Sequence, residues 1–120
     1  MVLAKFYMDE KRKLVSLNIK GHAGQSKQGR DLVCASASIL AYTLAQNVKG
    51  AQVRGILKCK PTLNLREGNA IIACRARDDE SYAEMCHAFV VIQAGYQILA
   101  HNYPQYVAVE TFGEDTGKEI

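Results

Sequence analysis

Two side chains of this sequence, His22 and Cys34, are of the types that make up a thiol nucleophile and its general base. A thiolate attacks a carbonyl carbon, and an imidazole can take the thiol proton and pass it to a leaving group. His22 follows an alternating apolar segment, and Cys34 lies near the start of a segment with helical periodicity. Spacing alone leaves a second interpretation open, because a single cysteine in a helix is commonly a small buried apolar residue.

The segment around the cysteine predicts a helix over residues 32–48, because its apolar residues recur at steps of four and three. The carboxylate of Asp31 can accept hydrogen bonds from the first amides of this helix, so we expect Asp31 at the N-cap. Cys34 then lies in the first turn, where unpaired N–H groups and the helix dipole favour a thiolate. The charge of Asp31 opposes that thiolate, and a protonated His22 would offset it.

Glycines surround the histidine and define a loop. Gly21 and Gly24 permit tight backbone turns on either side of His22. The polar residues between Gly24 and Gly29 predict a mobile loop, with these two glycines as hinges. Such a loop can close over a peptide and exclude water.

The segment from Gly21 to Ser38 resembles the motif of the ribosomal-processing cysteine protease family, called Prp. Its pattern is Gly-His-Ala-Gly followed by Gly-x-Asp-x-Val-Cys-Ala-x-x-Ser. The order of the expected elements also resembles that family over essentially the whole chain. The matching residues are Gly21, His22, Gly24, Gly29, Asp31, Val33, Cys34, Ala35 and Ser38.

The resemblance implies a cysteine endopeptidase that removes the N-terminal extension of large-subunit ribosomal protein twenty-seven. It implies Cys34 as the nucleophile and His22 as the general base. Asp31 would cap the helix or orient His22, and Ser38, one turn after Cys34, would hydrogen-bond near the site or to its own helix. The resemblance also implies a small α/β homodimer whose partner is the precursor of that ribosomal protein.

Length and composition agree with one globular domain, which we place at residues 1–112, followed by a polar tail at 113–120. The four cysteines are far apart and form no Cys-x-x-Cys pair, so we expect no metal site and no cofactor. Charged residues interrupt the N-terminal segment, so we expect no signal peptide, no membrane span and reduced thiols in the cytoplasm.

Alternating segments predict strands over residues 2–8, 14–20, 51–60, 62–66, 70–76 and 106–112. Gly50 is expected to end the first helix as its C-cap, and Arg54, Lys58 and Lys60 would form a basic stripe on the strand that follows. Asp78 or Asp79 would cap a second helix that Pro104 closes. The fold class is therefore α/β (α+β), a mostly antiparallel sheet in the order ββαβββαβ with two helices on one face. Apolar residues beyond the core stripe of the second helix suggest a dimer contact; these are Val90, Val91 and Ile98.

Two other functions remain open from the residues alone. The first is a non-catalytic ribosome-associated or RNA-binding module, compatible with the net charge of +3. Against direct nucleic-acid binding, Phe6, Phe89 and Phe112 are all expected on core faces, which leaves no aromatic platform for bases. The second is another cysteine hydrolase or a thiol-redox protein, which the lack of a cysteine near Cys34 in the sequence disfavours.

Overall fold

The computed structural model describes residues 1–22, 30–113 and 118–119, which form one mixed sheet and two long helices. The elements in chain order are β1 (Val2–Asp9), β2 (Leu14–Lys20), α1 (Arg30–Val53), β3 (Thr62–Arg66), β4 (Asn69–Arg75), α2 (Asp79–Asn102), β5 (Val107–Gly113) and β6 (Lys118–Glu119). The strand order across the sheet is β3-β4-β2-β1-β5-β6. Among the strand pairs of the described residues, only β1–β5 is parallel. The fold class predicted from the sequence is therefore confirmed.

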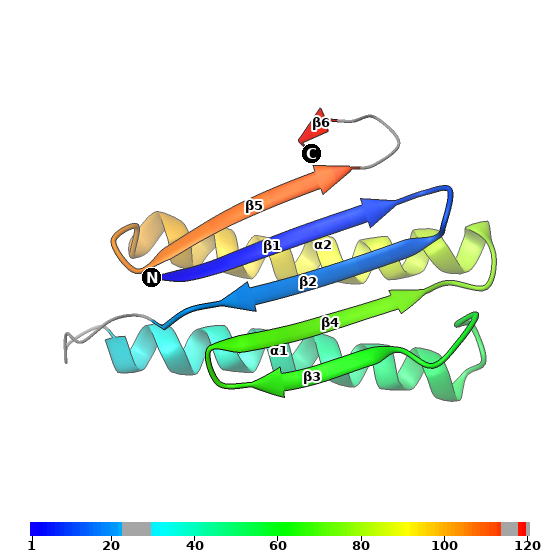
Figure 1. Ribbon diagram of the computed structural model, residues 1–120, viewed down its shortest axis with the longest axis horizontal. Coiled ribbons are helices and arrows are strands. Elements are labelled where there is room, and N and C mark those ends of the chain that lie inside the picture. The colour runs from blue at the N-terminus through cyan, green and yellow to red at the C-terminus, as the bar shows by residue number, and fades with distance from the viewer. Residues whose placement is uncertain (23–29, 114–117, 120) are drawn as a thin grey trace.

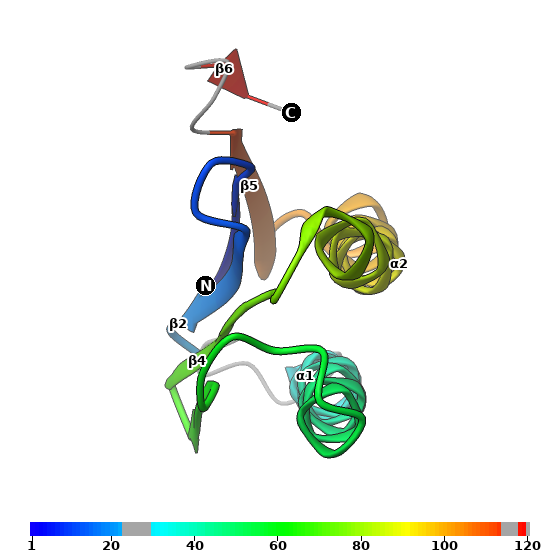
Figure 2. The ribbon, with the colours of Figure 1, turned by 90° about the vertical axis from the view of Figure 1, so that its right-hand side faces the viewer.

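Both helices cover the same face of the sheet, and no described helix or strand covers the other face (Figures 1 and 2). Alternation in the strands produces this arrangement, since every second side chain of β1 and β2 is buried against the helices. The largest fully buried side chains come from the sheet and from both helices, and they include Phe6, Leu17, Leu44, Met85, Phe89 and Tyr96. This common core fixes α1 and α2 relative to the strand ends.

Helix α2 begins as the sequence predicts. The Asp78 side chain accepts a hydrogen bond from the backbone N–H of Ser81 at 2.8 Å and so caps the helix. Hydrogen bonding to Ser81 lowers the pKa of this carboxyl group. The helix ends at Asn102, two residues before Pro104.

Helix α1 is longer than predicted, and the strand expected over residues 51–60 is absent. Val48 and Ala51 are both fully buried, so the helical period of core contacts continues through Gly50. Burial of this face offsets the helix propensity lost at a glycine, which is about 1 kcal/mol. The helix ends at Val53, and Gly55 follows with a φ of +76°. Gly50 is therefore not the C-cap.

The element order is ββαββαββ, because residues 54–61 contribute only an isolated bridge between Leu57 and Ala76. The predicted basic stripe does not exist as one strand face. Arg54 instead forms an ion pair with Glu84 of α2. Phe112 also differs from its prediction, since its side chain is 39% exposed. Among the described residues, no helix is both long and apolar enough to cross a membrane.

Tyr96 joins the two helices beneath the sheet, and this contact leads to a stability prediction. Its hydroxyl donates to the carbonyl oxygen of Ala37 in α1 at 2.7 Å, and its ring meets Phe6 edge-on with 6.0 Å between centroids. We expect Tyr96→Phe to lower the free energy of unfolding by about 1 kcal/mol, the usual net worth of one hydrogen bond. Urea unfolding measures this loss. Tyr42→Phe, at a half-exposed ring, is the control and should change stability by less than about 0.5 kcal/mol; equal losses in both variants would contradict the assignment.

Candidate active site

The site forms where β2 ends and the β3–β4 turn begins. Antiparallel pairing places Lys20 of β2 opposite Asn69 of β4, so the chain leaving β2 passes beside this turn. The backbone N–H of Gly21 donates to the carbonyl oxygen of Gly68 at 2.9 Å. This bond fixes the direction in which the chain continues to His22.

His22 lies directly against the backbone of Gly68. A Cβ atom built on Gly68 would fall 2.6 Å from His22 Nε2 and 2.8 Å from Cε1, which is closer than real Cβ contacts. Gly68 also has a φ of +78°, a conformation that side chains rarely adopt. The backbone conformation therefore favours glycine here, and any side chain at this position would displace the imidazole ring.

Gly21 is confined in a similar way. Its φ is +93°, and a Cβ atom on it would lie 2.1 Å from the carbonyl oxygen of Met1. No side chain fits between β2 and the start of the chain at this point. The residue before His22 is thus held on both sides, by Met1 and by Gly68.

Cys34 lies one turn into α1 and is half-buried. The side chains of Val33 and Ala37, on either side of it in the helix, are buried in the core. This packing anchors the first turns of α1 to the sheet, and the carbonyl oxygen of Ala37 also accepts the Tyr96 hydroxyl. The thiol is therefore presented by a fixed segment near a helix N-terminus, where unpaired amides favour an anion.

His22 and Cys34 line the same cavity, which has a volume of about 300 Å³. Ser38 lines it too, one helical turn after the cysteine. The structure therefore brings together four of the residues that the sequence singled out, because Gly21 also lines the cavity. An imidazole and a thiol that open on one cavity can carry out nucleophilic attack on a bound carbonyl group. The other lining residues are Val2, Ile19, Gly21, Ala37, Ala41, Tyr42, Leu65, Arg66, Glu67, Gly68, Asn69 and Ala70.

The remaining predicted site residues are only partly described. Gly24 and Gly29, the expected hinges, lie outside the described residues, as does the loop between them. Asp31 is the second residue of α1, which begins at Arg30, so it does not occupy the expected N-cap position. Its side chain is outside the described part, and its other expected role, orienting His22, stays a prediction.

Sequence reasoning missed the contribution of the β3–β4 hairpin to the cavity. Strands were expected over residues 62–66 and 70–76, and the structure joins them through a tight turn at Glu67 and Gly68. Nothing local in the sequence indicates that this turn meets His22, because the contact depends on β4 pairing with β2. Tyr42 of α1 was also missed, although it is one helical turn from Ser38.

The other three cysteines lie outside this cavity. Burial, with Cys86 and Cys59 nearby, raises the pKa of Cys74 to about 12, and burial also raises the pKa of Cys86. Cys59 is exposed in the loop after α1. Of the four cysteines, all in the described ranges, Cys34 is therefore the one that shares this cavity with His22. Within the described ranges, no cluster of three or more His, Cys, Asp or Glu side chains could hold a metal ion.

Comparison of the fold with solved structures finds similar proteins. The Streptococcus mutans protein SMU.848 superposes with a TM-score of 0.66 at 22% identity, over 95% of this chain and 96% of that one. An essential ribosomal processing protease Prp from S. aureus, in complex with a covalently linked product peptide, has a TM-score of 0.62 at 19% identity. That match covers 91% of this chain and 97% of the other. The same S. aureus protease in complex with a substrate peptide gives a TM-score of 0.62 at 18% identity, over 91% of this chain and 97% of the other. At these identities the likeness shows the fold.

Comparison with curated proteins finds no match. A family model does match the sequence, the one described as cysteine protease Prp, over residues 1–108. This range includes His22, Cys34 and every residue that lines their cavity. The match over most of the chain establishes that the protein belongs to the cysteine protease Prp family, a family of peptide hydrolases.

Proposed function

We propose that this protein is an endopeptidase that removes the N-terminal extension of large-subunit ribosomal protein twenty-seven, with a Cys34–His22 dyad. The observation that carries the proposal is the cavity lined by both side chains in a chain of the Prp family. The substrate part rests on the motif resemblance. It is also supported by the likeness of the fold to an S. aureus ribosomal processing protease. Ribosome assembly places this reaction in the cytoplasm.

In the proposed reaction, His22 takes the proton of the Cys34 thiol, and the thiolate sulfur attacks the carbonyl carbon of the scissile bond. The carbonyl oxygen becomes an oxyanion, which amides at the start of α1 stabilise. The intermediate collapses as His22 gives its proton to the leaving amine, and the C–N bond breaks. Water, deprotonated by His22, then releases the acyl group and restores the thiol.

The remaining site residues have supporting roles in this proposal. Asp31, in the first turn of α1, stabilises the helix start through the helix dipole or orients His22, and Ser38 donates a hydrogen bond near the reacting carbonyl or to its own helix. Gly24 and Gly29 act as hinges for the loop that covers the peptide.

The cavity suits an extended peptide. Strand β3 is at one edge of the sheet, and two of its residues, Leu65 and Arg66, line the cavity. A peptide that pairs with this edge as an added strand extends along β3 toward the cavity that contains Cys34. Alternate side chains of the peptide then face the mainly apolar lining formed by residues such as Val2, Ile19 and Tyr42.

The first prediction concerns cleavage of the host's own precursor of ribosomal protein twenty-seven. The wild-type protein should make one defined cut near the precursor's N-terminus, read by the masses of the products. Cys34→Ser should lower the rate by at least about a thousandfold, because removal of a nucleophile abolishes the covalent route. Cys59→Ser is the matched control, at an exposed thiol outside the cavity, and should cleave like wild type. Absence of the cut, or a cut that survives Cys34→Ser, would favour the non-catalytic ribosome-associated module.

A second prediction concerns Gly68 as a positioning residue for His22. A methyl group at Gly68 would displace the imidazole ring, so Gly68→Ala should lower kcat by about a hundredfold, the effect of a shift near 1 Å. Gly55→Ala is a matched control, since Gly55 has a φ of +76° and nothing within 4 Å of its added Cβ. Both variants should lose about 1–2 kcal/mol of stability from the left-handed backbone. Only Gly68→Ala should change the NMR chemical shifts of the His22 ring; equal kinetic losses in the two variants would show a purely structural role.

We also propose that the protein forms a homodimer through the outer side of its helical layer, which no other described element covers (Figure 2). Val91 and Ile98 are 56% and 62% exposed, and their spacing of seven places them on one side of α2. Sedimentation equilibrium should give twice the chain mass for wild type, and the Val91→Glu, Ile98→Glu double variant should be monomeric. Phe112→Glu, on the open face of the sheet, is the control and should stay dimeric. A monomeric wild type would refute this assembly.

A further inference from the structure

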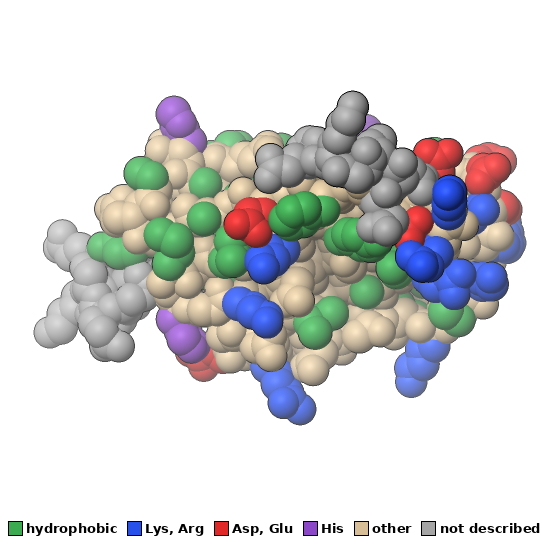
Figure 3. Space-filling model, turned by 45° about the horizontal axis from the view of Figure 1, so that its top comes forward, with side chains coloured by type: hydrophobic (Ala, Val, Ile, Leu, Met, Phe, Trp, Pro, Cys, Tyr) green, Lys and Arg blue, Asp and Glu red, His purple; other side chains and the backbone are tan. Residues whose placement is uncertain are grey.

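A second cavity, of about 350 Å³, lies at the opposite end of the sheet and is lined mainly by cations. It is formed by the β1–β2 turn, the loop after α1 and the end of β4. Lys and Arg side chains gather at this end of the molecule, beside several carboxylates (Figure 3). The cationic lining residues are Lys11, Arg12, Lys13, Lys58, Arg75 and Arg77, and the other two are Leu57 and Ala76.

Backbone hydrogen bonds join these three segments into one frame. The N–H of Ala76 donates to the carbonyl oxygen of Lys13 at 2.8 Å, which links the end of β4 to the β1–β2 turn. The N–H of Lys58 donates to the carbonyl oxygen of Arg75 at 2.8 Å, which links the loop after α1 to β4. The cations are therefore held on a fixed backbone before any ligand arrives, which lowers the entropic cost of binding.

A buried carboxylate holds the β1–β2 turn in shape. Asp9 is 1% exposed and accepts hydrogen bonds from the Arg12 backbone N–H at 3.2 Å and from the Arg12 guanidinium at 2.6 Å. Burial alone would raise the pKa of Asp9, but these bonds and the charge of Arg12 lower it. The Nε–H of Arg75 donates to the Arg12 carbonyl oxygen at 3.1 Å. These hydrogen bonds hold the β1–β2 turn in one conformation beside the cavity.

Carboxylates neutralise only part of this charge. Asp9 pairs with Arg12, Asp79 with Lys13 at 3.3 Å, and Asp78 with Arg77 at 3.1 Å. The other three lining cations form no ion pair with any residue in the described ranges; they are Lys11, Lys58 and Arg75. These three positive charges on one cavity favour a multiply charged anion.

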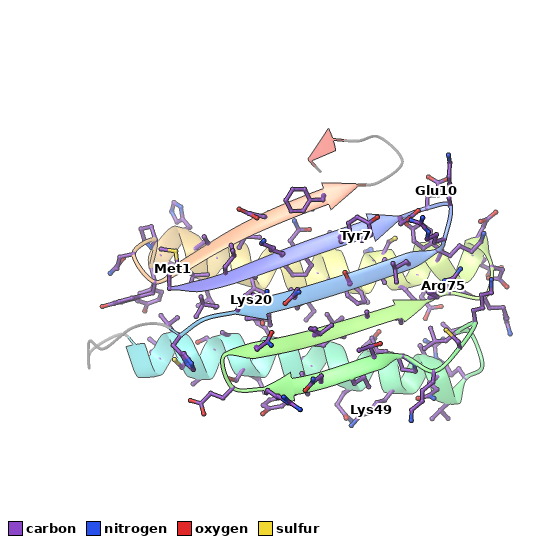
Figure 4. The ribbon with its side chains drawn as sticks, viewed as in Figure 1. Met1, Tyr7, Glu10, Lys20, Lys49 and Arg75 are labelled. Carbon is purple, nitrogen blue, oxygen red and sulfur yellow. The ribbon has the colours of Figure 1, made fainter. Side chains whose placement is uncertain are left out.

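The two cavities are far enough apart to be occupied together. Strand β2 runs from the cationic end to His22 over seven residues, which is roughly 20 Å. In Figure 4, Glu10 and Arg75 mark the cationic end, and Met1 marks the end where the catalytic cavity lies. A ligand at the cationic cavity therefore leaves the peptide cavity open.

We propose that the cationic cavity binds phosphate groups of an RNA backbone. Guanidinium and ammonium groups are the side chains that bind phosphates, and the arginines can do so through two parallel hydrogen bonds. The cavity has only Leu57 and Ala76 as apolar lining and no aromatic residue, so it lacks the core of a protein–protein interface. It also offers no surface for base stacking, so binding is independent of sequence. The site requires neither His22 nor Cys34 and so goes beyond the proposed peptidase.

The test measures binding of a short fluorescein-labelled single-stranded RNA of mixed sequence by fluorescence anisotropy at several salt concentrations. The cavity variant is Lys11→Gln, Lys58→Gln, and the control is Lys5→Gln, Lys49→Gln, which removes the same charge elsewhere on the surface. The cavity variant should bind about tenfold more weakly at low salt. The slope of log affinity against log salt should become shallower by about 1.4, since each lost phosphate contact on a single strand accounts for about 0.7. The control should bind like wild type.

Four results would overturn the proposal. The first is no RNA binding by wild type at low salt. The second is an equal loss of RNA affinity in the cavity variant and in the control variant. A third is binding of inorganic phosphate as tight as that of the RNA, which would make the cavity a site for a free anion. The fourth is equal binding of polyglutamate, which would make it a surface for acidic protein. Thermal unfolding of both variants checks that they fold. The cavity variant should hydrolyse a short peptide at the wild-type rate, which keeps this test separate from the peptidase proposal.

Discussion

The backbone hydrogen bond from Gly21 to Gly68 is the contact on which the candidate active site depends. It ties the chain leaving β2 to the β3–β4 turn at 2.9 Å, immediately before the histidine. The imidazole ring then lies against Gly68, where a methyl group has no room. Because α1 is anchored separately by its buried face, the histidine and the cysteine reach one cavity from two independent supports. The chemistry of the site thus depends on strand pairing as much as on the two reactive side chains.

The sheet acts as a spacer between two chemically different ends. One end has a mainly apolar cavity with a thiol and an imidazole, and the other has a cavity lined by six cations. Antiparallel strands produce this separation, because β2 starts at the cationic turn and ends next to His22. Under the two proposals above, RNA would be held at one end of the sheet and a peptide would be cleaved at the other.

Local patterns predicted much of this molecule, and contacts distant in sequence account for what they missed. Alternation in β1 and β2 identified the buried face, and the motif around Cys34 indicated two side chains, His22 and Cys34, that the structure places on one cavity. The end of α1 was predicted wrongly because Gly50 resembles a C-cap, whereas burial of Val48 and Ala51 carries the helix past it. The pairing of Gly68 with His22 and the grouping of Lys11, Lys58 and Arg75 arise only when strands pair. No local signal in the sequence reveals either one.

The central claim is that His22 activates Cys34, and cysteine alkylation against pH tests it most directly. Iodoacetamide labelling of each cysteine, resolved by peptide mass, would be followed in wild type and in His22→Ala. The account predicts that Cys34 is alkylated faster than exposed Cys59 at neutral pH in wild type and loses this advantage in His22→Ala. Exposed Cys59 should react at the same rate in both proteins, and Cys74, whose pKa burial raises to about 12, should stay unreactive. A Cys34 profile that matches Cys59 in both proteins would contradict the account.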